Sequence, residues 1–83
     1  MNKVLYFSAK WCGPCKILGP TMDRLKMGGM PVEKIDVDVN SEMSAKFGIR
    51  NIPCLILVDG SENEIKRSIG NKAENEILNW YNN

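Results

Sequence analysis

Two of the three cysteines in this chain, Cys12 and Cys15, are separated by only two residues. The stretch that contains them reads Trp11-Cys12-Gly13-Pro14-Cys15-Lys16. An apolar run precedes it and a helical pattern follows, so we expect the pair at the N-terminus of a helix. The N–H groups at such an end are unpaired and carry partial positive charge, which favours a thiolate. A C-x-x-C pair in this setting is typical of thiol–disulfide exchange.

The same spacing also occurs in zinc sites, which need a second pair of ligands. The chain has no histidine and one further cysteine, Cys54, so it lacks that second pair. We therefore predict no metal site. A carrier of a metal or an iron–sulfur cluster on Cys12, Cys15 and Cys54 remains an alternative.

Length and composition narrow the class of protein. The 83 residues are expected to form one domain, residues 1–83, and the 43% hydrophobic content is that of a globular chain. The net charge of +1 gives no reason to expect nucleic-acid or membrane-surface binding. The N-terminal apolar run at residues 4–7 is too short for a signal-peptide core or a membrane span. We therefore expect a cytoplasmic protein, in which cysteines serve chemistry more often than structural disulfides.

Hydrophobic periodicity predicts the order β-α-β-α-β-β-α, which is an α/β fold. We expect strands at residues 3–8, 33–37, 54–58 and 64–69. We expect helices at residues 12–27, 41–47 and 73–81. The first two strands need a parallel crossover connection, and the last two form an antiparallel hairpin.

Several side chains are expected to face the core from the helices. In the first helix they are Ile17, Leu18, Met22 and Leu25. In the last helix they are Ile77, Leu78, Trp80 and Tyr81. Pro20 lies inside the first helix, where we expect a kink because proline cannot donate a backbone hydrogen bond.

These motifs together resemble the thioredoxin family. The resemblance rests on the Cys-Gly-Pro-Cys stretch and on matches in order and spacing along nearly the whole chain. These matches are residues 7–11, Pro20, Lys34, residues 47–50, Ile52-Pro53 and Gly70. The resemblance implies a minimal thioredoxin fold, with a four-stranded mixed sheet flanked by three helices.

The resemblance also implies a function. Members reduce protein disulfides, hold no bound cofactor and are recycled by a thioredoxin-reductase-type flavoprotein that uses NADPH. Disulfide-containing client proteins such as ribonucleotide reductase are the expected partners, and the chain is expected to be a monomer.

Position within the motif suggests the role of each cysteine. Cys12, at the start of the helix, is expected to be the more exposed sulfur and the attacking nucleophile, with a pKa below the free-thiol value of ~8.5. Cys15, one turn deeper, would then attack Cys12 and release the reduced substrate. Gly13 and Pro14 fix the turn, and Pro14 costs no hydrogen bond at an early helical position.

Several other residues are expected to receive the substrate. Trp11 offers a flat apolar surface beside the dithiol. The resemblance implies a cis bond between Ile52 and Pro53, which would present the backbone of Ile52 to an extended substrate segment. Trp11 and Ile52 would form an apolar rim, with Ile69 beside Gly70 after the last strand as a further member.

The chain departs from the family pattern in three places. Its 83 residues do not contain the family's usual leading strand and helix. Cys54 follows Pro53 where threonine is usual, either as a buried apolar residue or as a thiol close enough to react with Cys12. Tyr6 stands where the family usually has a buried aspartate that accepts the proton of the second cysteine.

Tyrosine is a poor proton acceptor near neutral pH, since its unperturbed pKa is ~10. Tyr6 could instead donate a hydrogen bond to a Cys15 thiolate, and Lys34 on the neighbouring strand would lack a carboxylate partner. We therefore expect the Cys15 proton to leave with the help of solvent or Lys34, with Asp36 and Asp38 as the other candidate bases.

Two further functions remain open at this point. A glutathione-linked glutaredoxin is suggested by the short length, although its usual Pro-Tyr between the cysteines and its Gly-Gly turn are missing. The other open function is that of a docking subunit that binds a partner without using its thiols.

Overall fold

The order of the strands in the sheet decides where the cysteine pair lies. In the computed structural model, which describes residues 1–83, four strands form one mixed sheet in the order β2-β1-β3-β4. Their bounds are β1 (Lys3–Ser8), β2 (Val32–Asp36), β3 (Cys54–Val58) and β4 (Glu64–Ile69). β1 runs parallel to β2 and antiparallel to β3, and β3 and β4 are antiparallel. The predicted order of elements and the mixed sheet are confirmed.

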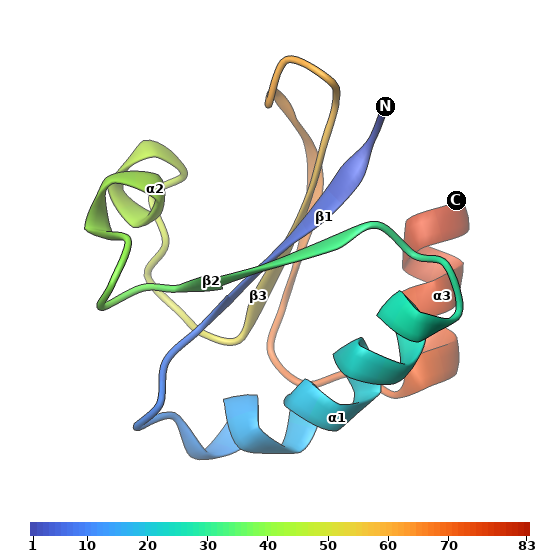
Figure 1. The fold of residues 1–83 in the computed structure, drawn as a ribbon, viewed down its shortest axis with the longest axis horizontal. Coiled ribbons are helices and arrows are strands. Elements are labelled where there is room, and N and C mark those ends of the chain that lie inside the picture. Colours follow the sequence, from blue (N-terminus) through green and yellow to red (C-terminus); the bar gives the residue numbers. More distant parts are fainter.

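Three helices cover the two faces of this sheet: α1 (Gly13–Met27), α2 (Ser41–Lys46) and α3 (Glu74–Asn82). α1 and α3 lie near each other, and α2 lies apart from them at the left of the view (Figure 1). Helix boundaries follow local signals. Cys12 caps the start of α1, Gly28 caps its end, and the Asn40 side chain accepts the N–H of Met43 at the start of α2.

Alternation along the central strands separates two clusters of core residues. On the side of α1 and α3, Val4, Tyr6, Leu55 and Leu57 pack with residues such as Leu18. The other cluster comprises Leu5, Phe7, Ile35, Phe47, Cys54, Ile56 and Val58. Because successive side chains of a strand point to opposite faces, Tyr6 lies under α1 and Cys54 lies in the other layer. β1 and β3 have nearly continuous apolar sequences because both of their faces are buried.

The predicted boundaries differ from the structure by about one residue. The second strand begins at Val32 and ends at Asp36, and the last helix begins at Glu74 and ends at Asn82. α1 continues through Pro20. No helix of the structure combines the length and the apolar character that crossing a membrane requires.

Two residues that were expected in the core, Ile17 and Leu78, are exposed. Ile17 is 71% exposed, whereas Leu18, Met22 and Leu25 are buried. These three follow the i, i+4, i+7 spacing of one helical face, and Ile17 is rotated away from that face by one residue. Leu78 is exposed for the same reason, next to buried Ile77.

The adjacent pair Ile17 and Leu18 gives a direct test of this packing. Leu18→Ala should lower the free energy of unfolding by about 2–5 kcal/mol, because it removes a side chain that is 2% exposed from the core. Ile17→Ala is the matched control and should change the free energy of unfolding by less than about 0.5 kcal/mol. Urea unfolding of the disulfide form measures both. Equal losses for the two variants would contradict the assigned face of α1.

Candidate active site

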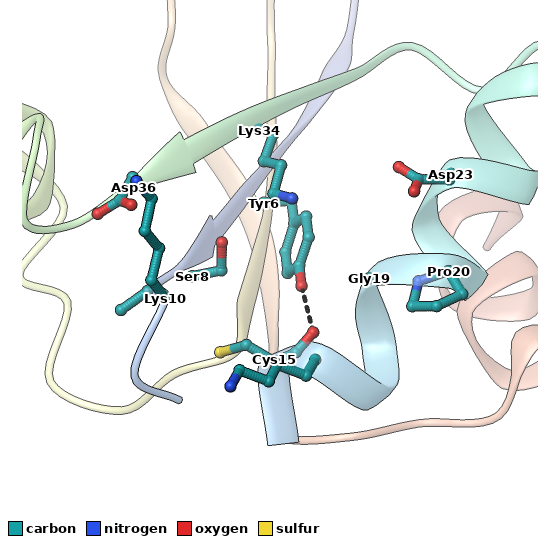
Figure 2. Close-up of a pocket in the computed structure, with 11 residues that line it drawn as sticks. Tyr6, Ser8, Lys10, Cys15, Gly19, Pro20, Asp23, Lys34 and Asp36 are labelled. Atoms are coloured by element: carbon teal, nitrogen blue, oxygen red, sulfur yellow. Dashed lines mark hydrogen bonds between the residues drawn. The ribbon is translucent and has the colours of Figure 1, made fainter. Parts of the chain in front are cut away.

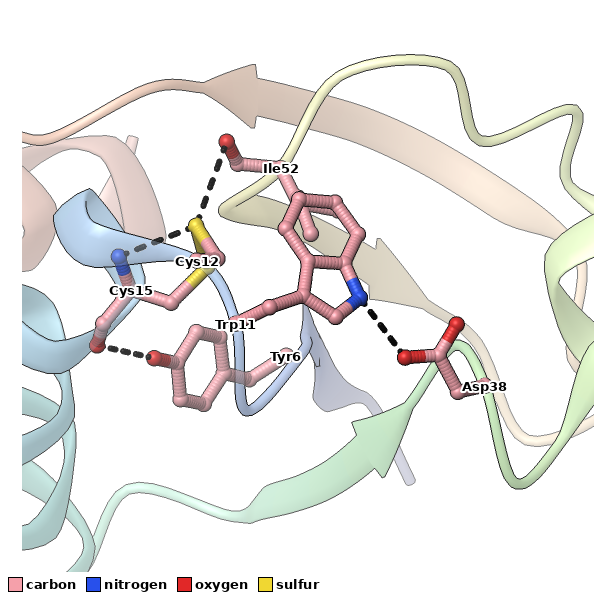
Figure 3. The surroundings of a disulfide bond; sticks show 6 residues. All are labelled: Tyr6, Trp11, Cys12, Cys15, Asp38 and Ile52. Atoms are coloured by element: carbon pink, nitrogen blue, oxygen red, sulfur yellow. Dashed lines mark hydrogen bonds between the residues drawn. A yellow bond between two sulfur atoms is a disulfide. The ribbon is translucent and has the colours of Figure 1, made fainter.

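The cysteine pair lies at the start of α1, with Cys12 at the helix cap and Cys15 in the first turn. Cys12 and Cys15 form a disulfide, with their Cα atoms 5.2 Å apart (Figure 3). Cys12 is the N-cap residue, and its Sγ accepts the backbone N–H of Cys15 at 3.2 Å. A sulfur in this position takes the place of the usual oxygen cap. When Cys12 is a thiolate, the hydrogen bond becomes charge-assisted and the helix N-terminus adds to its stabilisation.

The residues between the cysteines suit this turn. Gly13 and Pro14 are exposed and occupy the first positions of α1. Pro14 has no N–H to donate, and an N–H in the first turn has no partner within the helix. The predicted place of both residues is thus confirmed.

The expected difference in exposure between the two cysteines is absent. Cys12 is 5% exposed and Cys15 is 4% exposed, so exposure does not distinguish the two cysteines in the disulfide form. Both pack with Ala9, and partly buried Val37 and Ile52 cover this cluster. What distinguishes Cys12 in the structure is its place at the helix cap.

The loop before β3 lies against Cys12. The carbonyl oxygen of Ile52 is 3.9 Å from Cys12 Sγ (Figure 3). The Ile52–Pro53 peptide bond is cis, as predicted. Gly70 donates its N–H to the Pro53 carbonyl at 2.9 Å and has a φ of 89°, a conformation that favours glycine. The end of β4 therefore holds this loop beside the dithiol.

Trp11 forms an exposed wall next to the pair. Its side chain is 69% exposed, and its Nε1 donates a hydrogen bond to Asp38 Oδ2 at 2.7 Å. Asp38 is placed by a tight turn after β2, in which its N–H donates to Asp36 Oδ1 at 2.8 Å. Sequence reasoning considered Asp38 only as a candidate base and missed this contact. The two residues are 27 positions apart, and no local pattern joins them.

Tyr6 lies beneath the dithiol, as the resemblance implied, but its contact differs from the expected one. The phenol donates to the backbone carbonyl of Cys15 at 3.0 Å and not to the sulfur (Figure 2). Tyr6 is 2% exposed, and burial raises the pKa of its phenol above the ordinary value of 10.0. The phenol is therefore a neutral donor to the first turn of α1.

An open cavity of about 660 Å³ adjoins this side of the site. Tyr6, Cys15, Gly19 and Lys34 are among its lining residues (Figure 2). Lys34 stands opposite Tyr6 in the parallel register of β1 and β2, as expected. It is exposed and takes part in none of the four ion pairs of the structure, so it has no carboxylate partner.

Cys54 is buried in the core of the protein. It is 1% exposed within the cluster on the other face of the sheet, and it is a free thiol. Burial is the main cause that raises its pKa, with a smaller opposing effect of the Arg67 charge. The three cysteines do not gather into a metal-binding group. The interpretation of Cys54 as a buried apolar residue fits this position.

Comparison with known proteins gives one consistent result. The family model described as thioredoxin matches residues 1–83. A thioredoxin of Rickettsia felis is 37% identical over 79 residues, which cover 92% of this chain and 74% of the relative. A bifunctional thioredoxin reductase/thioredoxin of Mycobacterium leprae is 37% identical over 75 residues, which cover 87% of this chain and 16% of that protein. A thioredoxin structure from Nicotiana alata superposes with a TM-score of 0.86 at 31% identity, and covers 95% of this chain and 69% of that one.

The burial of Cys54 predicts that it stays unreactive in the folded protein. A raised pKa leaves less thiolate near neutral pH than the ordinary thiol value of ~8.5 would give, and the core blocks access. Iodoacetamide should therefore label Cys54 only after unfolding in urea, which serves as the control. Mass mapping after mild oxidation should show the Cys12–Cys15 disulfide with Cys54 free. A Cys12–Cys54 disulfide, or equal labelling of folded and unfolded Cys54, would show that Cys54 belongs to the redox site.

Proposed function

This chain belongs to the thioredoxin family of disulfide oxidoreductases, and we propose that it reduces protein disulfides with Cys12 as the attacking thiolate and Cys15 as the resolving thiol. The observation that carries this proposal is the hydrogen bond from the Cys15 N–H to Cys12 Sγ at the helix cap. It stabilises negative charge on one sulfur of the pair, and the thiolate is the form that attacks a disulfide.

The reaction has two exchanges. In the first, the Cys12 thiolate attacks a sulfur of the substrate disulfide, that S–S bond breaks, and one substrate sulfur leaves as a thiolate. In the second, Cys15 attacks Cys12 Sγ, the Cys12–Cys15 bond forms, and the second substrate sulfur leaves. Two electrons pass from the protein dithiol to the substrate. The 5.2 Å between the two Cα atoms keeps the resolving thiol close and favours the second exchange over escape of the mixed disulfide.

The surface around Cys12 is suited to an extended peptide. Trp11 provides an exposed apolar wall, and its bond to Asp38 fixes the ring. Ile52 borders the site with its carbonyl oxygen 3.9 Å from Cys12 Sγ, and its backbone would pair with the substrate as an added strand, whereas the Pro53 side chain is buried. Gly70 anchors the Pro53 carbonyl and keeps this edge in place.

Recycling completes the proposal. A thioredoxin-reductase-type flavoprotein would return electrons from NADPH to the Cys12–Cys15 disulfide, with no cofactor bound to this chain. The Mycobacterium leprae relative supports this partner, because its name joins a reductase and a thioredoxin in one protein. We propose further that the chain acts as a monomeric single domain in the cytoplasm. Its clients would be disulfide-containing proteins such as ribonucleotide reductase.

Insulin reduction tests the reaction and its electron donor. Turnover is expected with thioredoxin reductase and NADPH, and little turnover is expected with glutathione and glutathione reductase. Reduction supported by glutathione alone would identify a glutaredoxin-type activity instead.

The two cysteine variants test the assigned roles. Cys12→Ser should abolish insulin reduction, because the helix cap then holds a hydroxyl in place of the nucleophilic sulfur. Cys15→Ser should accumulate a mixed disulfide between Cys12 and the substrate, visible by mass spectrometry, because no thiol remains to resolve it. Cys54→Ser is the matched control and should keep the activity of the unchanged chain. A mixed disulfide that forms in Cys12→Ser and not in Cys15→Ser would reverse the roles.

A further inference from the structure

The second exchange requires the Cys15 thiol to lose a proton, and the groups packed around Cys15 include no base. Ala9, Val37 and Ile52, which contact the cysteine pair, are apolar. The chain has no histidine. The Tyr6 phenol is already a donor to the Cys15 carbonyl. The proton acceptor must therefore come from outside this apolar cluster.

The cavity beside Cys15 is the route by which such an acceptor can arrive. Its volume of about 660 Å³ exceeds by far the roughly 30 Å³ that one water occupies in the liquid. Its lining comes from β1, α1 and β2, with Tyr6 between Cys15 and Lys34 (Figure 2). Gly19 lines this space, and a Cβ at that position would meet no atom within 4 Å, so the cavity is open there.

Charged side chains stand around the opening of this cavity. They are Lys10, Lys16, Asp23, Lys34 and Asp36. Asp36 already accepts the Asp38 N–H through Oδ1, and Asp23 is exposed on α1. The positive charges favour a thiolate at Cys15 over the neutral thiol. None of the five is hydrogen-bonded to Cys15.

We propose that the Cys15 thiol gives its proton to water in the cavity bounded by Tyr6, Gly19 and Lys34, so that solvent is the base of the second exchange. This inference rests on the proposed role of Cys15 as the resolving thiol. Water accepts the Cys15 proton, and the resulting thiolate attacks Cys12 Sγ. The substrate sulfur leaves as a thiolate and takes a proton from solvent, so protons and electrons balance over the step. Tyr6 holds the Cys15 carbonyl throughout and transfers no proton.

Rapid mixing of the reduced protein with 5,5′-dithiobis(2-nitrobenzoic acid) separates the two exchanges, in a Cys54→Ser background. The first release of thionitrobenzoate depends on reagent concentration and reports attack by Cys12. The second release is independent of that concentration and reports attack by Cys15. The Cys15→Ser variant should give one release only. Two releases from that variant would show that Cys15 is not the resolving thiol. This control therefore distinguishes an error in the proposed cysteine roles from an error in the solvent route.

Two variants of one residue test the cavity. Gly19→Leu places a bulky side chain in the open space and should slow the second release by about tenfold, since proton transfer is a large part of its rate. The first release should change less than about twofold, because charge on Cys12 is stabilised by the helix cap. Gly19→Ala is the matched control and should leave both releases near their original rates. Equal rates of the second release in Gly19→Leu and Gly19→Ala would overturn the solvent route.

The two carboxylates at the opening provide an independent test with surface substitutions that leave the core unchanged. Asp23→Asn and Asp36→Asn should each keep the second release within about twofold, because neither carboxylate takes the proton. Asparagine at position 36 can still accept the Asp38 N–H, so the turn is preserved. A tenfold loss in either variant would make that carboxylate the base and overturn the inference.

Discussion

The hydrogen bond from the Cys15 N–H to Cys12 Sγ is the contact on which the proposed chemistry of this chain depends. It makes one sulfur the cap of α1 and leaves the other inside the first turn, so two chemically identical residues meet different electrostatic surroundings. A helix N-terminus favours negative charge on its cap, and a hydrogen bond to an ionised group is stronger than one between neutral groups. The exposure of the two cysteines is nearly equal, so the proposed division of roles rests on this asymmetry.

The sheet supplies the fixed frame for that turn. β1 leads directly into the dithiol, and the loop before β3, which accepts the Gly70 N–H at Pro53, places the Ile52 carbonyl beside Cys12. Alternation along β1 places Tyr6 under α1, where its hydroxyl supports the Cys15 carbonyl. The same alternation along β3 turns Cys54 into the opposite layer of the core. The alternation of side chains along the strands thus puts Tyr6 and Cys54 on opposite faces of the sheet.

Local signals predicted much of this arrangement. The position of the C-x-x-C pair at the start of a helix, the order of the elements and the apolar run of β3 each depend on neighbouring residues, and the structure confirms them. Two contacts between distant segments could not be predicted. The Trp11–Asp38 bond depends on a turn after β2, and the Tyr6 hydroxyl reaches a backbone carbonyl that no sequence pattern reveals. The burial of Cys12 likewise results from packing against the loop before β3.

The ionisation of Cys12 in the reduced protein tests the central claim most directly. Thiolate absorbance near 240 nm, followed against pH in the Cys54→Ser variant, gives the midpoint for the pair, and limiting iodoacetamide identifies the sulfur that ionises first. The helix cap predicts a first midpoint below the ordinary thiol value of ~8.5, with alkylation at Cys12. A first midpoint at or above that value, or alkylation that begins at Cys15, would contradict the assignment of Cys12 as the stabilised thiolate.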